Sequence, residues 1–145
     1  GSFVSELQQV EKAIRKLVGR DPARATRLYE IFIAGCYQKA EEVDDSDGEL
    51  GAFVEGLHYA WVKARQAAGA DREETARILL NCMDNDPYGF CCRLEREAAR
   101  AFDKEGLRAF EQQVRSRFEA AGVAPAPGSD EGSRRDSRLR PPSLG

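Results

Sequence analysis

The sequence has no long apolar run. No segment approaches the roughly 20 consecutive apolar residues that a membrane-spanning helix needs. The first ten residues, GSFVSELQQV, also lack the charged block and the apolar block of a secretory signal. The expectation is therefore a protein without membrane contact and with a cytoplasmic location.

Residues typical of catalytic and metal sites are also scarce. Histidine occurs once, at His58, and the four cysteines, Cys36, Cys82, Cys91 and Cys92, include no Cys-x-x-Cys pair. A single histidine excludes a two-histidine metal site and a multi-histidine proton relay. The cysteine spacing argues against a zinc or redox motif, so buried free thiols are expected. Because no Gly-x-Ser-x-Gly, phosphate-loop or dinucleotide motif occurs either, the sequence predicts a protein that is not an enzyme and binds no cofactor.

The sequence also lacks an excess of positive charge. The chain has 22 basic and 25 acidic residues, a net charge of −3 and a pI near 5.3. Such a balance creates no broad positive field, so nucleic-acid binding through the folded body is disfavoured. The charge is unevenly divided, since residues 123–145 contain four arginines and three acids, which leaves 18 basic against 22 acidic residues, a net charge of −4, for residues 1–122.

Strand signals are absent, and helical periodicity is present instead. There is no sustained apolar alternation and no hairpin turn flanked by β-branched residues. Apolar residues recur every three or four positions in six segments, which predicts an all-α fold. The predicted helices cover residues 3–18, 22–43, 50–64, 71–83, 86–102 and 103–118.

The third predicted helix has the clearest period. Its apolar stripe is expected to be buried, and His58 is expected at the border of that stripe with its polar tip exposed. The stripe consists of Leu50, Phe53, Leu57 and Trp61.

Helix ends and short junctions predict the arrangement. Asp21, before Pro22, is typical of a helix N-cap, and Asp103 is expected to cap a later helix. Asp71 and Glu74 have the spacing of a capping box at the start of another helix. Gly19 and Gly69 are expected to end helices in the left-handed conformation. Short junctions favour antiparallel neighbours, so residues 1–122 are predicted to form one domain of three antiparallel pairs, an irregular α-solenoid-like array of the HEAT or tetratricopeptide kind.

Residues 123–145 have a different composition. The segment APAPGSDEGSRRDSRLRPPSLG is rich in proline, glycine, serine and arginine. It contains too few large apolar residues to offset the entropy cost of folding. A disordered tail is therefore predicted.

The acidic segment EEVDDSDGELG, residues 41–51, has two interpretations. An EF-hand with Gly48 at loop position six would place Val43 and Val54 at ligand positions, so that reading fails. Ser46 and Glu49 instead have the spacing of a capping box, in which each side chain bonds the other's backbone amide. Aspartates at positions 44, 45 and 47 would then lie near the positive end of the following helix dipole.

The sequence contains a second acidic junction, Asp84-Asn85-Asp86, between two predicted helices. The two junctions together suggest an acidic edge that binds a protein partner, with a basic protein as one candidate. Alternatively, they form a cation or small-ligand site in a regulatory domain, because oxygen-rich clusters suit hard cations. The residues concerned are Asp44, Asp45, Asp47, Glu49, Asp84 and Asp86.

Residues 44–51, DDSDGELG, and 86–89, DPYG, carry a resemblance to a known family. The chain resembles, over about residues 21–121, an uncharacterised bacterial family of α-helical domains often found beside SWIM-type zinc fingers. In that family a D-D-S-D-G-x-[IL]-G turn and a later D-D-Y-G turn precede helices. The first turn matches here, whereas Pro87 interrupts the second, and the zinc finger's own cysteine and histidine spacing is absent. The resemblance implies a helical-repeat scaffold linked to nucleic-acid or mobile-element biology, and no known reaction.

We interpret the sequence as a non-enzymatic helical-repeat scaffold or protein-protein interaction module. The regulatory domain that binds a cation or small ligand is the alternative.

Overall fold

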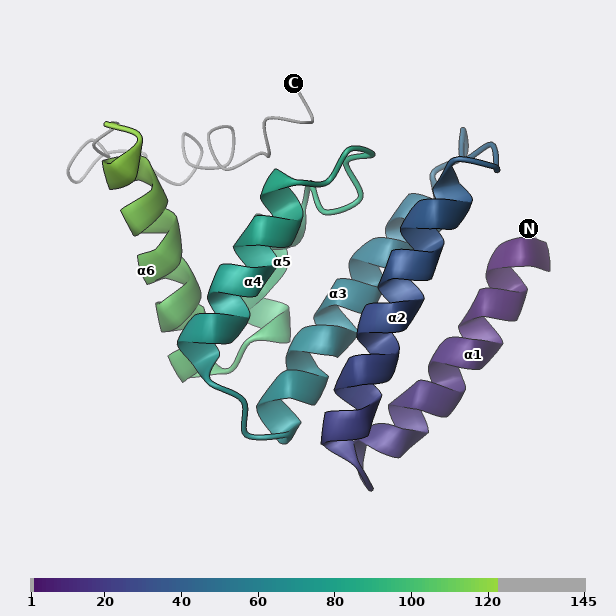
Figure 1. Cartoon of the computed structure of the whole chain (residues 1–145), viewed down its shortest axis with the longest axis horizontal. Coiled ribbons are helices and arrows are strands. Elements are labelled where there is room, and N and C mark those ends of the chain that lie inside the picture. Colours follow the sequence, from purple (N-terminus) through teal and green to yellow (C-terminus); the bar gives the residue numbers. More distant parts are fainter. Residues whose placement is uncertain (1, 123–145) are drawn as a thin grey trace. The chain divides into compact units, whose positions relative to one another are not determined.

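The computed structural model describes residues 2–122, and these residues are all helical apart from their connections (Figure 1). The six helices are α1 (Ser2–Val18), α2 (Pro22–Ala40), α3 (Glu49–Ala67), α4 (Arg72–Asp84), α5 (Leu94–Ala101) and α6 (Lys104–Ala120). The described residues include no strand, so the all-α prediction is confirmed. The predicted disordered tail, residues 123–145, lies outside the described residues.

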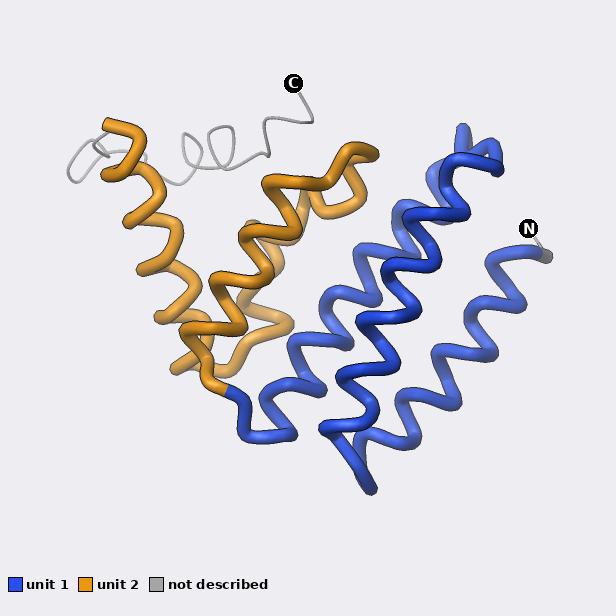
Figure 2. Tube along the Cα trace, viewed as in Figure 1, with its two compact units in different colours: residues 1–70 blue, residues 71–145 orange. Residues whose placement is uncertain are grey.

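The chain divides into two compact units, coloured separately in Figure 2. The N-terminal unit, residues 2–70, contains α1, α2 and α3. The C-terminal unit contains α4, α5 and α6, within residues 71–122. In the N-terminal unit each helix contacts the other two, whereas α4 contacts chiefly α6 in the C-terminal unit. Helices adjacent in sequence were expected to pair, and the α4–α6 contact differs from that expectation.

Asp21, Asp71 and Asp103 cap helices as predicted, but Asp71 bonds the Glu73 amide and not the Glu74 amide of the predicted capping box. Asp21 accepts the Arg24 amide at 3.1 Å, Asp71 the Glu73 amide at 3.3 Å, and Asp103 the Gly106 amide at 2.8 Å. Each bond satisfies a donor that the first helical turn leaves without a partner. These three helix starts are therefore determined locally.

Two helix ends differ from the prediction. Gly69 is left-handed, with φ of 77°, but Gly19 is absent from the glycines of positive φ. There the amides of Arg20 and Asp21 both donate to the Leu17 carbonyl, so a right-handed turn ends α1 without glycine's special conformation. The second helix ends at Ala40, before the predicted Val43.

The core of the N-terminal unit lies on the inner faces of its helices. Tyr29 is fully buried in α2, and Trp61 in α3 donates its indole N–H to the Glu30 carboxylate at 2.9 Å. Leu50, Leu57 and Trp61 are buried as predicted, whereas Phe53 is half-buried and meets Phe32 edge-to-face at 5.7 Å. The predicted stripe is therefore buried except at Phe53.

His58 departs from the prediction of an exposed tip. Its side chain is only 2% exposed, and Nδ1 lies 2.8 Å from the Val54 carbonyl oxygen. One turn of α3 thus supplies the polar partner that water was expected to supply, because residues four apart lie above one another on a helix.

The C-terminal unit joins α4 to α6 by apolar packing and by ion pairs. Arg72 donates to Asp103 at 2.6 Å, and Arg117 pairs with Asp84 at the other end of α4. Between these pairs lie buried apolar side chains, among them Leu79, Leu80, Met83, Phe110, Val114 and Phe118.

Leu57→Ala should destabilise the protein more than Phe53→Ala. Leu57 is 1% exposed, so its truncation leaves a cavity and should cost about 2–5 kcal/mol. Phe53 already faces solvent in part and loses less burial. Urea unfolding of both variants measures the difference, and a larger loss for Phe53→Ala would contradict the packing described.

Candidate functional site

The first acidic turn has a structural role at the start of α3. Asp45 accepts two backbone amides, from Leu50 at 2.7 Å and from Gly51 at 2.9 Å. Asp47 accepts the Glu49 amide at 3.1 Å. Gly48 occupies the cap position with φ of 75°, in the left-handed region that favours glycine. The first-turn donors of α3 are therefore satisfied by two aspartates.

The predicted Ser46–Glu49 capping box is wrong. The Ser46 hydroxyl and amide donate to Asp44 at 3.4 and 3.1 Å, and the Glu49 amide bonds Asp47 instead of Ser46. The left-handed Gly48 turns the chain immediately before α3, which places Ser46 outside the helix start. The longer Asp45 side chain, with two acceptor oxygens, reaches over this turn.

In the second acidic turn, an aspartate side chain again accepts backbone amides of the residues that follow it. Asp86 is 1% exposed and accepts the amides of Tyr88 at 3.2 Å and Cys91 at 2.6 Å. Gly89, three residues after Asp86, has φ of 72°, as Gly48 follows Asp45 by three. Both turns therefore share an Asp-x-x-Gly form in which the aspartate holds the amide five residues later.

This geometry corrects the predicted start of the fifth helix. Asp86 and Pro87 were expected to open it, but residues 87–93 form turns and α5 begins at Leu94. Asp86 stabilises the turn because both its oxygens bond amides inside residues 88–91.

The acidic residues proposed as an interaction edge or cation site therefore carry internal contacts. Asp45, Asp47 and Asp86 bond backbone amides, and Asp84 pairs with Arg117. Among residues 2–122, no group of three or more histidine, cysteine or acidic side chains is arranged to hold a metal ion. The basic-partner edge and the cation site stay predictions.

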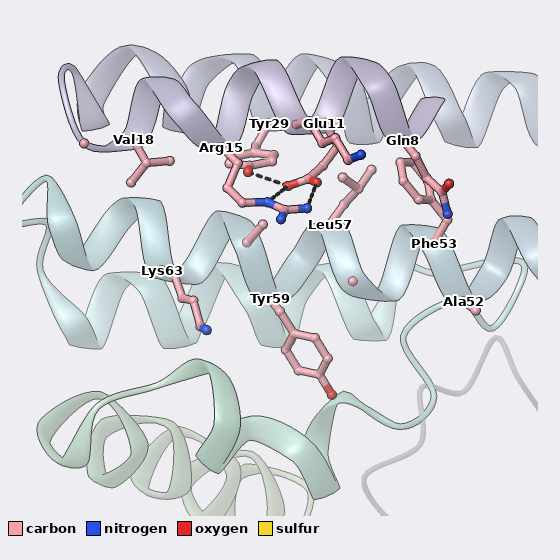
Figure 3. Close-up of a pocket in the computed structure, with 14 residues that line it drawn as sticks. Gln8, Glu11, Arg15, Val18, Tyr29, Ala52, Phe53, Leu57, Tyr59 and Lys63 are labelled. Atoms are coloured by element: carbon pink, nitrogen blue, oxygen red, sulfur yellow. Dashed lines mark hydrogen bonds and ion pairs between the residues drawn. The ribbon is translucent and has the colours of Figure 1, made fainter. Parts of the chain in front are cut away.

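The N-terminal unit contains a groove that the sequence did not predict (Figure 3). It has a volume of about 790 Å³ and runs along α1 and α3, with Tyr29 of α2 at its floor. Gln8 and Val18 are ten positions apart, which corresponds to about 15 Å of α1. The lining residues are Gln8, Glu11, Lys12, Arg15, Val18, Gly19, Tyr29, Ala52, Phe53, Gly56, Leu57, Tyr59, Ala60 and Lys63.

A hydrogen-bonded network of three side chains lies in the groove. The Tyr29 hydroxyl donates to Glu11 Oε2 at 2.9 Å, and Arg15 Nε donates to the same oxygen at 3.1 Å while Nη2 pairs with Oε1. Figure 3 shows Glu11 and Arg15 extending from α1 toward α3. Burial, and next the hydrogen bond to Glu11, raise the pKa of Tyr29 above its ordinary value of 10.0.

The charges along the groove are mainly positive. Three cations, Lys12, Arg15 and Lys63, line it with one carboxylate, Glu11. Lys12 and Lys63 are exposed, and neither forms an ion pair within residues 2–122. Figure 3 places Lys63 and Tyr59 on the side of α3 away from Glu11, so Lys63 lies at the rim. The groove therefore has a net charge of +2 in a chain of net charge −3.

Part of this groove had a signal in the sequence. Ala52, Gly56 and Ala60 are spaced by four, so they share one face of α3, and Glu11 and Arg15 have the spacing of a helical ion pair. The sequence gives no sign that the two faces meet across Tyr29, because that depends on tertiary packing.

The buried Cys36 thiol offers little nucleophilic chemistry. All four are free, and burial raises the pKa of the Cys36 thiol to about 11. At neutral pH this thiol is protonated, which is the form that does not attack electrophiles.

Comparison with family models, curated proteins and solved structures found no match for this chain. The resemblance to the bacterial helical family therefore stays a prediction. No helix within residues 2–122 has both the length and the apolar character needed to cross a membrane.

Asp45→Ala should destabilise the protein by about 1–2 kcal/mol, as for a lost N-cap. Ser46→Ala should change stability by less than about 0.5 kcal/mol, since the serine bonds only its exposed neighbour Asp44. Asp45→Asn, which keeps one acceptor oxygen, should fall between them. Urea unfolding ranks the three variants, and a larger loss for Ser46→Ala would restore the capping box.

Because of Tyr29, we expect the folded protein to lose stability in alkaline solution. Its folded-state pKa is raised, so its contribution is complete below pH 10.0, the ordinary value, and declines as pH rises toward the folded-state pKa. Tyr29→Phe should cost about 1.5–3 kcal/mol at neutral pH, because a hydrogen bond to a charged group is lost. The difference between the two proteins should shrink above pH 10, measured by urea unfolding at stepped pH. A constant difference would contradict the buried hydrogen bond.

Proposed function

We propose that this protein is a non-enzymatic interaction module whose N-terminal unit takes up a helical segment of a protein partner in the α1/α3 groove. The groove itself is the observation that carries this proposal. It provides about 790 Å³ of open space against a half-buried Phe53 and a buried Leu57, next to polar side chains that orient a ligand.

The length of the groove suits a helix. About 15 Å of α1 corresponds to nearly three helical turns, and partner helices bind such grooves through side chains at i, i+3 or i+4, and i+7. A helix lying there would have neighbours from α1 and α3 and would extend the three-helix unit toward a four-helix packing.

The α3 side of the groove allows the backbone of a partner helix to approach closely. Ala52 and Gly56 are exposed and Ala60 is half-buried, so this wall presents small side chains over two turns. The distance between packed helices depends on side-chain size at the contact, and small residues permit the shorter distances.

Gly56 offers a direct test of this proposal. A Cβ built at Gly56 meets no atom within 4 Å, so a leucine there is accommodated by α3 and projects into the groove. Gly35 in α2 also has open space around it and does not line the groove. Gly35→Leu is therefore the matched control, and neither change should reduce stability, since glycine disfavours helix interiors.

The experiment uses a displayed library of amphipathic helical peptides with unbiased charge, selected on the full chain. Selected peptides should bind the wild type and Gly35→Leu equally, and Gly56→Leu at least about tenfold more weakly, equivalent to about 1.4 kcal/mol. Isothermal calorimetry supplies the affinities. Peptides that bind Gly56→Leu as tightly as wild type would place the site elsewhere, and a selection without enriched peptides would contradict the proposal.

A further inference from the structure

We infer that the segment bound in the α1/α3 groove is an acidic amphipathic helix, with a carboxylate that pairs with Arg15 and further acids near Lys12 and Lys63. This inference rests on the proposed function and specifies the chemistry of the partner. Its basis is the contrast between a groove of net charge +2 and a chain of net charge −3.

Arg15 is held in position before any partner arrives. Its Nε and Nη2 bond Glu11, and Glu11 is held from the other side by the Tyr29 hydroxyl. Nη1 has no partner among residues 2–122, and the Arg15 side chain is 66% exposed. A guanidinium fixed through one edge presents its remaining N–H groups without a further loss of side-chain entropy, which suits a charge-assisted bond to a carboxylate.

The lysines extend this preference over the length of the groove. Lys12 lies three residues before Arg15 on α1, and Lys63 lies at the rim of the groove on α3. Because both are exposed and lack ion pairs within the described chain, an incoming carboxylate replaces no internal bond. Complementary charges at an interface rim mainly increase the association rate and select the partner.

The apolar surface completes the recognition. Phe53 of α3 and Val18 of α1, both half-buried, line the same groove as these cations. A bound helix therefore needs an apolar face flanked by acids. The chain's own segment 123–145 has four arginines against three acids, the opposite charge from the one expected.

The test compares two synthetic peptides of about 14 residues, or four helical turns. Both carry leucines at i, i+3, i+4 and i+7, and their flanking positions are all glutamate in one peptide and all lysine in the other. Fluorescence anisotropy should show tighter binding of the glutamate peptide to the full chain, with a salt dependence that the lysine peptide lacks.

Charge reversal identifies the groove as the origin of this preference. Lys12→Glu with Lys63→Glu should weaken binding of the glutamate peptide about tenfold or more and strengthen binding of the lysine peptide. Arg24→Glu with Arg27→Glu changes the net charge equally at exposed positions of α2 outside the groove, and should alter neither affinity by more than about twofold. If the double variant binds the lysine peptide more tightly, it is folded, so unfolding cannot explain its weaker binding of the glutamate peptide.

Several results would overturn the inference. Equal affinity for the two peptides, no binding of the glutamate peptide, or equal losses in both double variants would each do so. Library peptides that need Gly56 but show no enrichment of acids would leave the proposed function intact while removing the acidic partner. Sedimentation that shows a dimer dissociated by Gly56→Leu would make a second copy of the chain the occupant instead.

Discussion

The buried hydrogen bond from Tyr29 to Glu11 joins α1 to α2. Among the described side chains of α1, only Glu11 and Ile14 are buried, whereas the other large apolar side chains that face the unit are half-buried: Phe3, Val4, Leu7, Leu17 and Val18. A buried carboxylate without a partner is costly, which gives this bond a large influence on the position of the helix. Since α1 forms one wall of the groove, the shape of the groove depends on the same contact.

The network also connects stability with recognition. Arg15 completes the neutralisation of Glu11 and at the same time keeps one nitrogen without an internal partner. Arg15 therefore makes a structural bond to Glu11 and also keeps N–H groups available to an incoming partner. An acidic protein thereby offers a local cationic site, which overall charge alone would not indicate.

The two Asp-x-x-Gly turns explain why acids concentrate at the helix junctions. In each turn a left-handed glycine redirects the chain, and the aspartate three residues earlier bonds amides that the redirection exposes. Acidic clusters in this chain are therefore first a means of satisfying backbone donors. Their negative charge is also favourable beside the N-terminus of α3.

The sequence by itself determined the all-α class and three of the helix starts. Caps at Asp21, Asp71 and Asp103 depend on atoms two or three residues away, and apolar periodicity depends on helix geometry alone. Tertiary structure decided the features that depend on contacts between residues far apart in the chain. The packing of α3 in the N-terminal unit buried His58. The Asp45 cap is local, since Asp45 bonds the Leu50 amide five residues later, but the left-handed turn at Gly48 that allows this bond was not recognised in the sequence. The groove brings Glu11 and Arg15 of α1 together with Gly56 of α3, and no local pattern specifies that meeting, because it depends on how the three helices pack.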